Sequence, residues 1–433
     1  MENETNIIRD WNELDCVEEQ ISCIESDEKW LRVIGSAGTG KSVALCRRAK
    51  RFLEQGDTVL LISGQTQIVD NYIYDLIRKS LEPYFKDERM RLKYVMEFFG
   101  EYAPDIREDM KDHLIVNFMS KVGKRTCEKV QEEFTEFYDK YKDRFDAMMV
   151  DHVLVDEAQD VPMEALYIFG RLARKDFTIA ATHEQSIFCL NTNNIFYTGT
   201  IIMSPNGGFK TNWMAFQEAL CGEGNSFTDS CMGIEYRMTD KIFEFSRVVL
   251  GEKDGQKATA GVEGEKPRLV SCNSQDEELK YLLNEIKVLD ERINKNGEDR
   301  RVGIICSKYA KEAKDDFKRD VNGICSQLEK EGIKVKRKEQ GGEKKRVDAP
   351  TATEPGIYVL NVADAKGLEF EDVYVFLDKD TFLSFGKGIK EFYVAVSRAR
   401  LLLTIITDAN NKNKLLQGGN LVKYLELVAV DLK

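Results

Sequence analysis

The sequence predicts an α/β protein with two parallel sheets, and three observations lead to this fold class. Short apolar segments alternate with helical segments early in the chain, as in residues 30–63. A second alternating set begins after about residue 250. A glycine-rich loop, residues 35–42, stands between the first apolar segment and the first helical one. Such alternation is typical of parallel sheets whose strands are joined by helical crossovers.

The elements of the first sheet follow from apolar runs and their stop signals. WLRVI (30–34) and DTVLLIS (57–63) are short apolar runs that predict buried strands. Between them, KSVALCRRAKRFLEQG (41–56) predicts a helix that ends at Gly56. MMVDHVLVDEAQD returns to a strand pattern, and FTIAAT (177–182) predicts a further strand.

Six later apolar runs predict a second parallel sheet, with helical segments such as DEELKYLLNEIKVLDERI between some of them. These runs are PRLVSC, RRVGIICS, IKVKRK, GIYVLNV, DVYVFL and LLLTIIT. We therefore place the first domain in residues 1–78 and 148–250 and the second domain in residues 251–433. The connection 189–235 contains TNNIFYTGTIIMSPNGGFKTNW, which predicts either a hairpin or partner surface, or a peripheral loop packed on the core.

Residues 79–147 differ from their flanks and predict a helical insertion in the first domain. Large apolar residues recur there at the helical spacing i, i+3, i+4, i+7. The two sets are Leu92, Val95, Met96 and Phe99, and Phe134, Phe137, Tyr138 and Tyr141. Such stripes are more often the core face of amphipathic helices than a base-stacking surface, so we favour the core interpretation.

The composition is that of an ordinary globular protein. The chain has 433 residues and a net charge of −12, whereas a large nonspecific polyanion binder is usually basic. Any nucleic-acid contact must therefore be a local stripe on an acidic body, or be absent. No run of 18 apolar residues appears, and the ten cysteines include no CxxC pair. We expect reduced, mostly buried thiols, no zinc site, and a cytoplasmic protein without a membrane partner.

Residues 35–42 carry the strongest motif. GSAGTGKS matches G-x-x-x-x-G-K-[ST] between an apolar strand and a helix, the context that the motif requires. Its glycines let backbone N–H groups surround phosphate oxygens, and the helix N-terminus adds partial positive charge. We expect Lys41 to reach the β- and γ-phosphates of ATP and the Ser42 hydroxyl to ligate Mg²⁺. The remaining residues of the predicted cradle are Gly35, Ser36, Ala37, Gly38, Thr39 and Gly40.

Adjacent carboxylates end the apolar run VLVDEAQD (153–160). A buried strand ending at Asp156 would deliver a carboxylate to Mg²⁺, and Glu157 would orient or activate the attacking water. Neighbouring carboxylates repel each other, so a bound cation stabilises the pair. Ser42 and Asp156 are thus the predicted metal ligands. Gln20, shortly before the first strand, has an amide suited to the adenine edge, although a lone Gln carries no signal by itself.

DEAQD, following such a loop, resembles superfamily 1 helicases of the UvrD/Rep type. GSAGTGKS is similar to the first motif of that family, and Gln20 to its adenine-reading glutamine. EQSIF resembles the third motif, which implies that Gln185 couples the nucleotide state to the DNA track. EYRMTDKI resembles the N-Y-R-S motif, which implies that Tyr236 stacks on the base and that Arg237 touches the γ-phosphate.

Two more motifs extend the resemblance to residue 400. AKGLEF resembles the fifth motif, which implies that Glu369 contacts the ribose. FYVAVSRAR resembles the sixth, which implies that Arg398 is the arginine finger. The resemblance implies two RecA-like domains of the P-loop NTPase class, with ATP in the cleft between them and 3′ to 5′ movement on single-stranded DNA. The short loop at 339–355 indicates a compact form that lacks the large second insertion domain.

The sequence departs from the family pattern chiefly where the family contacts DNA. The departures are Ile62 for an aromatic residue, Ala181 and Thr182 for Gly-Asp, Leu190 for a stacking Trp, Asn191 for an Arg, and Ala363 for a His. A lost stacking partner removes roughly 1–3 kcal/mol per base. We favour an ATP-driven single-strand translocase or helicase because Gln185 and the fifth motif persist. The alternative is a nucleotide-dependent switch that docks a protein partner, such as a nuclease in DNA repair or phage defence.

Overall fold

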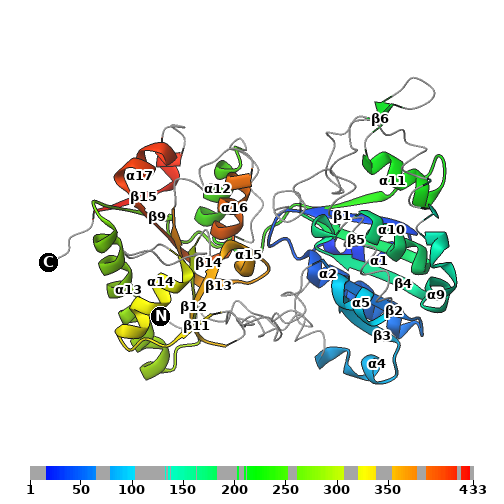
Figure 1. Ribbon diagram of the computed structural model, residues 1–433, viewed down its shortest axis with the longest axis horizontal. Coiled ribbons are helices and arrows are strands. Elements are labelled where there is room, and N and C mark those ends of the chain that lie inside the picture. Colours follow the sequence, from blue (N-terminus) through cyan, green and yellow to red (C-terminus); the bar gives the residue numbers. More distant parts are fainter. Residues whose placement is uncertain are drawn as a thin grey trace. The chain divides into compact units, whose positions relative to one another are not determined.

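The computed structural model describes most of two α/β units. The described residues are 16–64, 79–102, 132, 135–136, 138–161, 163–182, 202–203, 209–210, 212–251, 261–306, 320–337, 354–377, 387–416 and 421–429. The described residues up to Gly233 form the first compact unit, and those from Ile234 onward form the second. Figure 1 labels most of the helices and strands of both.

The first unit contains a parallel sheet of six strands in the order β3-β2-β4-β5-β1-β8. The strands are β1 (Trp30–Gly35), β2 (Val59–Ser63), β3 (Met90–Tyr94), β4 (Val150–Asp156), β5 (Ala173–Ala181) and β8 (Thr228–Met232). Because the strands are parallel, their carboxyl ends lie at one edge of the sheet. The glycine-rich loop follows β1, and the acidic stretch follows β4 at that same edge.

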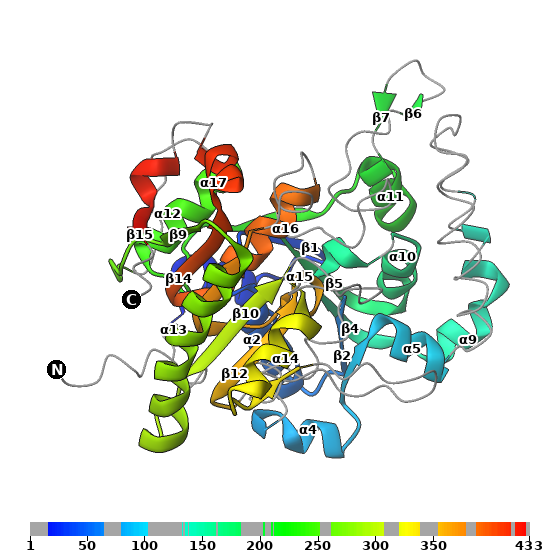
Figure 2. The same cartoon turned by 60° about the vertical axis from the view of Figure 1, so that its left-hand side comes forward.

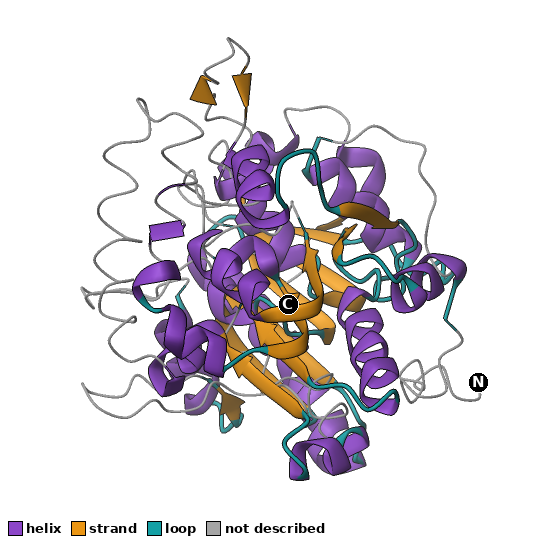
Figure 3. Ribbon diagram, turned by 90° about the vertical axis from the view of Figure 1, so that its right-hand side faces the viewer, coloured by secondary structure: helices purple, strands orange, loops and turns teal. Residues whose placement is uncertain are grey.

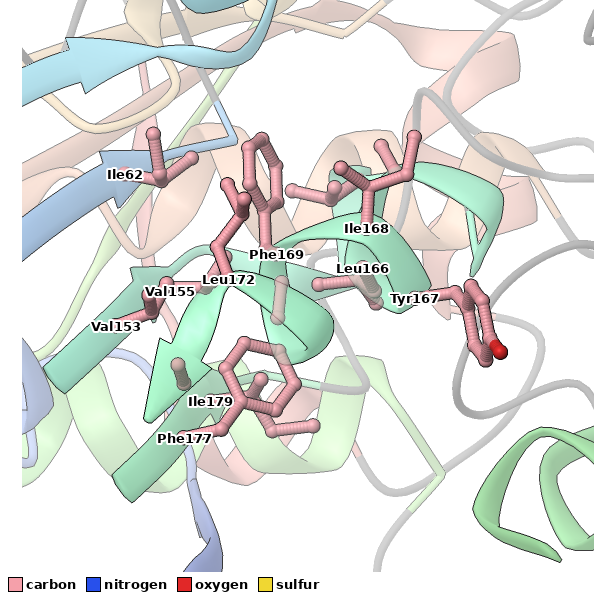
Figure 4. Packing of buried hydrophobic residues seen from close by; sticks show 14 of the residues in the cluster. Ile62, Val153, Val155, Leu166, Tyr167, Ile168, Phe169, Leu172, Phe177 and Ile179 are labelled. Atoms are coloured by element: carbon pink, nitrogen blue, oxygen red, sulfur yellow. The ribbon is translucent and has the colours of Figure 1, made fainter. Parts of the chain in front are cut away.

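Helices cover both faces of the first sheet. One face packs against α1 (Glu18–Glu25) and α2 (Lys41–Glu54). The other packs against α5 (Val95–Tyr102), α9 (Lys142–Ala147), α10 (Met163–Leu172) and α11 (Asn212–Cys221). Figure 4 shows Phe169 and Leu172 of α10 close to the strand residues Val153 and Val155. Burial of these large apolar side chains is the main stabilising term for the unit.

The second unit contains a parallel sheet of seven strands in the order β11-β12-β10-β13-β14-β9-β15. They are β9 (Arg268–Cys272), β10 (Arg301–Cys306), β11 (Val335–Lys336), β12 (Gly356–Asn361), β13 (Phe370–Phe376), β14 (Ala399–Asp408) and β15 (Glu426–Ala429). The helices α13 (Gln275–Asn296) and α14 (Val321–Lys330) pack over its strands, as Figure 2 shows.

Further helices complete the second unit. The helices α12 (Asp240–Val249) and α16 (Lys387–Val396) pack together through an edge-to-face contact of Phe245 with Phe392, whose ring centroids are 6.3 Å apart. The short helices are α15 (Val362–Ala365), α17 (Ala409–Leu416) and the 3₁₀ helix η6 (Leu421–Tyr424). Figure 3, coloured by secondary structure, shows helices around the strands. The predicted domain boundary at 250–251 lies beyond α12, which packs on α16 and β14 of this second unit.

The segment predicted as a helical insertion contains a strand as well as helices. The prediction that Leu92 lies on a helix was wrong, because Met90–Tyr94 forms β3 at the edge of the first sheet. Its buried residues Met90, Leu92 and Tyr94 alternate with Arg91 and Lys93, the period of a strand. The helices α4 (Glu82–Lys86), α5 and α9 lie in the same segment. The extent of the insertion as a subdomain stays a prediction.

The structure tests two further predictions, the core role of the aromatic residues in 79–147 and the hairpin in the connection 189–235. Phe99 and Tyr138 are buried in the core of the first unit, which confirms the core interpretation for these residues. In the connection, β6 (Ile202–Met203) pairs with β7 (Phe209–Lys210) in an antiparallel hairpin. Phe134 and Phe137 lie outside the described residues.

Most of the described cysteines are buried. The buried thiols are those of Cys23, Cys46, Cys272, Cys306 and Cys325. Burial raises the pKa of Cys23 to about 12, so this thiol stays protonated. Among the helices that the structure describes, none has the length and apolar character needed to cross a bilayer.

Candidate nucleotide site

The glycine-rich loop has the backbone shape of a phosphate cradle. It leaves β1 at Gly35 and enters α2 at Lys41, with Gly38 and Gly40 in the left-handed region at φ 79° and 83°. A Cβ on Gly40 would lie 2.3 Å from Nε2 of Gln20. Gly40 is therefore favoured by its own left-handed backbone, and a side chain there would also displace the Gln20 carboxamide.

Lys41 lies inside the loop. Its side chain is only 8% exposed, and Nζ donates to the carbonyl oxygens of Gly35 and Ser36, each at 2.7 Å. The ammonium group thus stands at the N-terminus of α2, where the helix dipole also favours an anion. Positive charge is concentrated where the motif predicts phosphate binding.

Ser42 and Asp156, the two predicted metal ligands, are in direct contact. Ser42 Oγ donates to Oδ2 of Asp156 at 2.6 Å, although 114 residues separate them. Asp156 is 1% exposed, and its other oxygen, Oδ1, accepts from the Glu157 amide at 2.9 Å. A hydroxyl and a buried carboxylate beside a phosphate loop are the oxygen ligands that Mg²⁺ prefers, so these two residues fit the ion.

Glu157 has an uncommon backbone conformation for a residue with a side chain. Its φ is 53° and its ψ 39°, in the left-handed region. The backbone approaches Gly64 so closely that a Cβ on that glycine would lie 2.4 Å from the Glu157 carbonyl oxygen. Non-glycine residues in this region cluster at functional sites, where surrounding contacts hold them in place.

Gln159 holds the Glu157 side chain in place. It lies in the 3₁₀ helix η4 (Ala158–Asp160), and its Nε2 donates to Oε2 of Glu157. Its Oε1 accepts from the Thr182 amide at 3.0 Å, just beyond the end of β5. Gln159 therefore joins the acidic stretch to the start of the predicted third motif.

Two consecutive residues of α1 contact different segments of the first unit, and Gln20 is the one that reaches the loop. Gln20 is buried on α1, and its Nε2 lies 3.4 Å from the Thr39 carbonyl oxygen. Its carboxamide therefore contacts the loop backbone. The neighbouring Glu19 accepts from the Gly233 amide at 2.7 Å, at the end of the first unit.

The second unit brings Arg237 and Glu369 together. Arg237 Nη2 lies 2.6 Å from Oε1 of Glu369 in an ion pair. Burial raises the pKa of Glu369, but the guanidinium groups of Arg237 and Arg400 outweigh burial and lower it to about 2. Tyr236 is half-buried in the same turn. Two side chains from motifs that are 132 residues apart in the sequence are thus direct neighbours.

Arg398 is buried within its own unit, with 1% of its surface exposed. Its Nε donates to the Val394 carbonyl at 3.0 Å, Nη1 to the Leu368 carbonyl at 3.2 Å, and Nη2 to Ser397 Oγ at 2.9 Å. These bonds tie the end of α16 to the loop that precedes β13. Its role as an arginine finger stays a prediction.

The remaining predicted positions differ in whether the structure describes them. Gln185, Leu190 and Asn191 lie outside the described residues. Ala363 lies on α15, and Ile62 is buried in the core of the first unit. Ile62 therefore contributes to packing.

Comparison with known proteins supports the helicase class. Residues 288–407 match the family described as the viral superfamily 1 RNA helicase core domain. No curated protein matches the chain. The solved C-terminal domain of a possible DNA helicase from Lactobacillus plantarum WCFS1 is 18% identical and covers 44% of this chain and 98% of its own. Its TM-score of 0.30 is too low to add to the argument.

The fold and this family match agree with each other. Two parallel-sheet α/β units, the first with a glycine-rich loop between β1 and α2, have the RecA-like P-loop NTPase fold that the sequence predicted. The match within the second unit indicates a superfamily 1 helicase core and an NTP-hydrolysing enzyme.

Sequence reasoning missed three residues that shape these sites. Gln159 orients Glu157, Gly64 permits the close passage of the Glu157 backbone, and Glu235 supports the turn that carries Arg237. Gln159 and Glu235 each lie inside a motif already identified, so motif membership was an available signal. Nothing local marks Gly64, because its role depends on a contact with a distant strand end.

Proposed function

We propose that this protein is an ATP-dependent translocase or helicase of the UvrD-like type that acts on single-stranded DNA. The observation that carries the proposal is the 2.6 Å bond between Ser42 Oγ and Asp156 Oδ2, beside the lysine of a glycine-rich loop. This arrangement suits a nucleoside triphosphate with its Mg²⁺. The similarity of residues 288–407 to a helicase core supports work on nucleic acid.

In the first unit we assign four residues to the chemistry. Lys41 binds the phosphates, Ser42 and Asp156 hold Mg²⁺, and Glu157 takes a proton from the attacking water. Bound Mg²⁺ would neutralise the negative charge on the phosphate oxygens. The buried Asp156 carboxylate stays in place because the Glu157 amide and the Ser42 hydroxyl both donate to it.

In the second unit we assign the groups that the family resemblance implies. Arg237 and Arg398 stabilise charge on the γ-phosphate, Glu369 contacts the ribose, and Tyr236 stacks on the base. Gln185 couples the nucleotide state to the strand. The Arg237–Glu369 ion pair supports this assignment, because it keeps a guanidinium and a carboxylate from two motifs at one place.

One observation favours a second candidate function, a nucleotide-dependent switch that regulates a protein partner such as a nuclease. Ala363 occupies the first turn of α15, where the family has a histidine that lies by the DNA. An Ala provides neither a hydrogen bond nor a stacking surface. A weak binding surface for single-stranded DNA would leave NTP hydrolysis intact and uncouple it from DNA.

The test is the ATPase rate with single-stranded DNA, with single-stranded RNA and with neither, over a salt titration. We expect DNA to stimulate turnover and the stimulation to decline as salt rises, because phosphate contacts release counterions. The RNA arm is needed because the matched family is described as an RNA helicase core. Turnover that neither nucleic acid changes would contradict the motor and favour the switch.

We expect Glu157→Gln to retain ATP binding and to stop hydrolysis, because the amide keeps the shape of the side chain but cannot accept the proton of water. Glu88→Gln is a matched control, since Glu88 is exposed and also has a positive φ, 59°. Binding is measured by calorimetry and turnover by phosphate release. Normal turnover in Glu157→Gln would overturn the assignment of the base.

A further inference from the structure

A buried carboxylate supports the turn that carries Tyr236 and Arg237. Glu235 is 0% exposed. Its Oε1 accepts from the Arg237 amide at 3.0 Å, and its Oε2 accepts from the Met238 amide at 2.8 Å. Both oxygens of one side chain therefore hold two consecutive amides, which fixes the backbone that positions the Arg237 side chain.

Glu235 also lies in the electrostatic field of the Arg237–Glu369 ion pair. Arg237 carries one positive charge, and Glu369 carries a negative charge across the 2.6 Å contact. Arg400 of β14 adds a further guanidinium that acts on Glu369. The groups that face Glu235 are therefore its own neighbour Arg237 and, from the loop before β13, Glu369.

The protonation of Glu235 changes in the neutral range. Burial raises its pKa to about 7, although Arg237 and the two backbone amides lower it in part. Below that pH the carboxyl group is neutral, and Glu369 still pairs with Arg237. Above it, a second negative charge is buried beside the same guanidinium.

We propose that Glu235 is a positioning residue for Arg237, which fixes its turn and, through its charge, sets how strongly Arg237 engages a phosphate. This inference rests on the proposed function, because it assigns Arg237 to the nucleotide. A phosphate must compete with Glu369 for the guanidinium. An ionised Glu235 repels the phosphate and attracts Arg237, and both effects are strong where water is largely excluded.

The expected result is a pH-dependent KM for ATP in the wild-type protein. We expect KM to rise at least about threefold between pH 6 and pH 8, as Glu235 loses its proton, with a smaller change in kcat. In Glu235→Gln, which is neutral at every pH, this additional rise should disappear. ATP itself titrates in the same range, but that effect is common to all variants and cancels in the comparison.

Two further variants show whether the effect acts through Arg237. In an Arg237→Gln background, Glu235→Gln should leave KM and its pH profile unchanged, because no guanidinium is left to modulate. Glu244→Gln, on the neighbouring α12 where Glu244 pairs with Lys241 at 3.8 Å, is a matched control and should behave as wild type. Thermal unfolding of each variant identifies losses caused by misfolding.

The outcomes separate this inference from the proposed function. A wild-type protein that hydrolyses ATP with the same pH profile as Arg237→Gln would overturn the role of Glu235 and leave the ATPase intact. That comparison does not depend on the folding of Glu235→Gln. Complete lack of ATP hydrolysis by the wild-type protein, with or without nucleic acid, would instead contradict the proposed function.

Discussion

Replacement of Lys41 by alanine is expected to reduce ATP turnover by at least about 10²–10³-fold, the effect of removing one group that stabilises transition-state charge. The ammonium group lies within 2.7 Å of the Gly35 and Ser36 carbonyl oxygens, inside the loop and at the start of α2. A triphosphate in this loop would meet that charge first. Alanine leaves the glycines and the helix N-terminus but removes the only side-chain cation within the loop sequence.

The control for this variant lies on the same helix. Lys50→Ala removes a lysine from α2 that is partly exposed and only 3.9 Å from Glu54, so its loss should not change turnover. Lys41 also bonds to loop carbonyls, and its loss could loosen the loop itself, so thermal unfolding is compared with phosphate release. Turnover of Lys41→Ala at the wild-type rate would refute the phosphate cradle.

The central strands could be predicted from sequence, because nearly all their side chains are apolar and such segments are buried. WLRVI, DTVLLIS and GIYVLNV correspond to β1, β2 and β12 within a residue or two of the predicted ends. The edge strand β8 could not be predicted, since its sequence TDSCM has neither apolar alternation nor β-branched enrichment. It forms because its backbone pairs with Leu31–Gly35 of β1 over all five of its residues. That pairing is a tertiary contact, which local sequence does not reveal.

The segment at β3 shows how two periods can coincide. Leu92, Val95 and Phe99 satisfy helical spacing, yet Leu92 belongs to a strand and the other two to α5. A strand that runs directly into a helix can present apolar residues at spacings that imitate a single longer helix. Only the pairing of Leu92 with Leu61 of β2 decides the matter, and sequence does not reveal pairing.

In the candidate site too, the identity of the residues could be predicted from sequence, whereas most of their contacts could not. A motif supplies identity and order, so Lys41, Ser42 and Asp156 could be named in advance, and the Ser42–Asp156 contact follows from the parallel strand ends. The partners of a side chain depend on the packed structure. Gln20 against the loop backbone and Arg398 against carbonyls of its own unit are contacts that no motif specifies.

Replacement of Arg398 by alanine is expected to lower kcat by about 10³-fold or more, the range typical of arginine fingers in phosphoryl transfer. KM for ATP should change little, because the finger stabilises charge that develops in the transition state. In the structure its guanidinium donates to Val394, Leu368 and Ser397. Because only 1% of its surface is exposed, Arg398 must move to reach a phosphate, which makes part of its catalytic contribution a conformational step.

The same bonds mean that Arg398→Ala also removes a stabilising contact, and the experiment must separate the two effects. Loss of a buried charged donor costs roughly 1.5–3 kcal/mol of stability. Ser397→Ala disturbs the same cluster, because Ser397 Oγ accepts from Arg398 and donates to the Val394 carbonyl, yet it leaves the guanidinium in place. We expect Ser397→Ala to lower the unfolding temperature while kcat stays within about threefold of wild type. An equal loss of kcat in both variants, or an Arg398→Ala defect confined to KM, would show that Arg398 acts only through folding or ground-state binding.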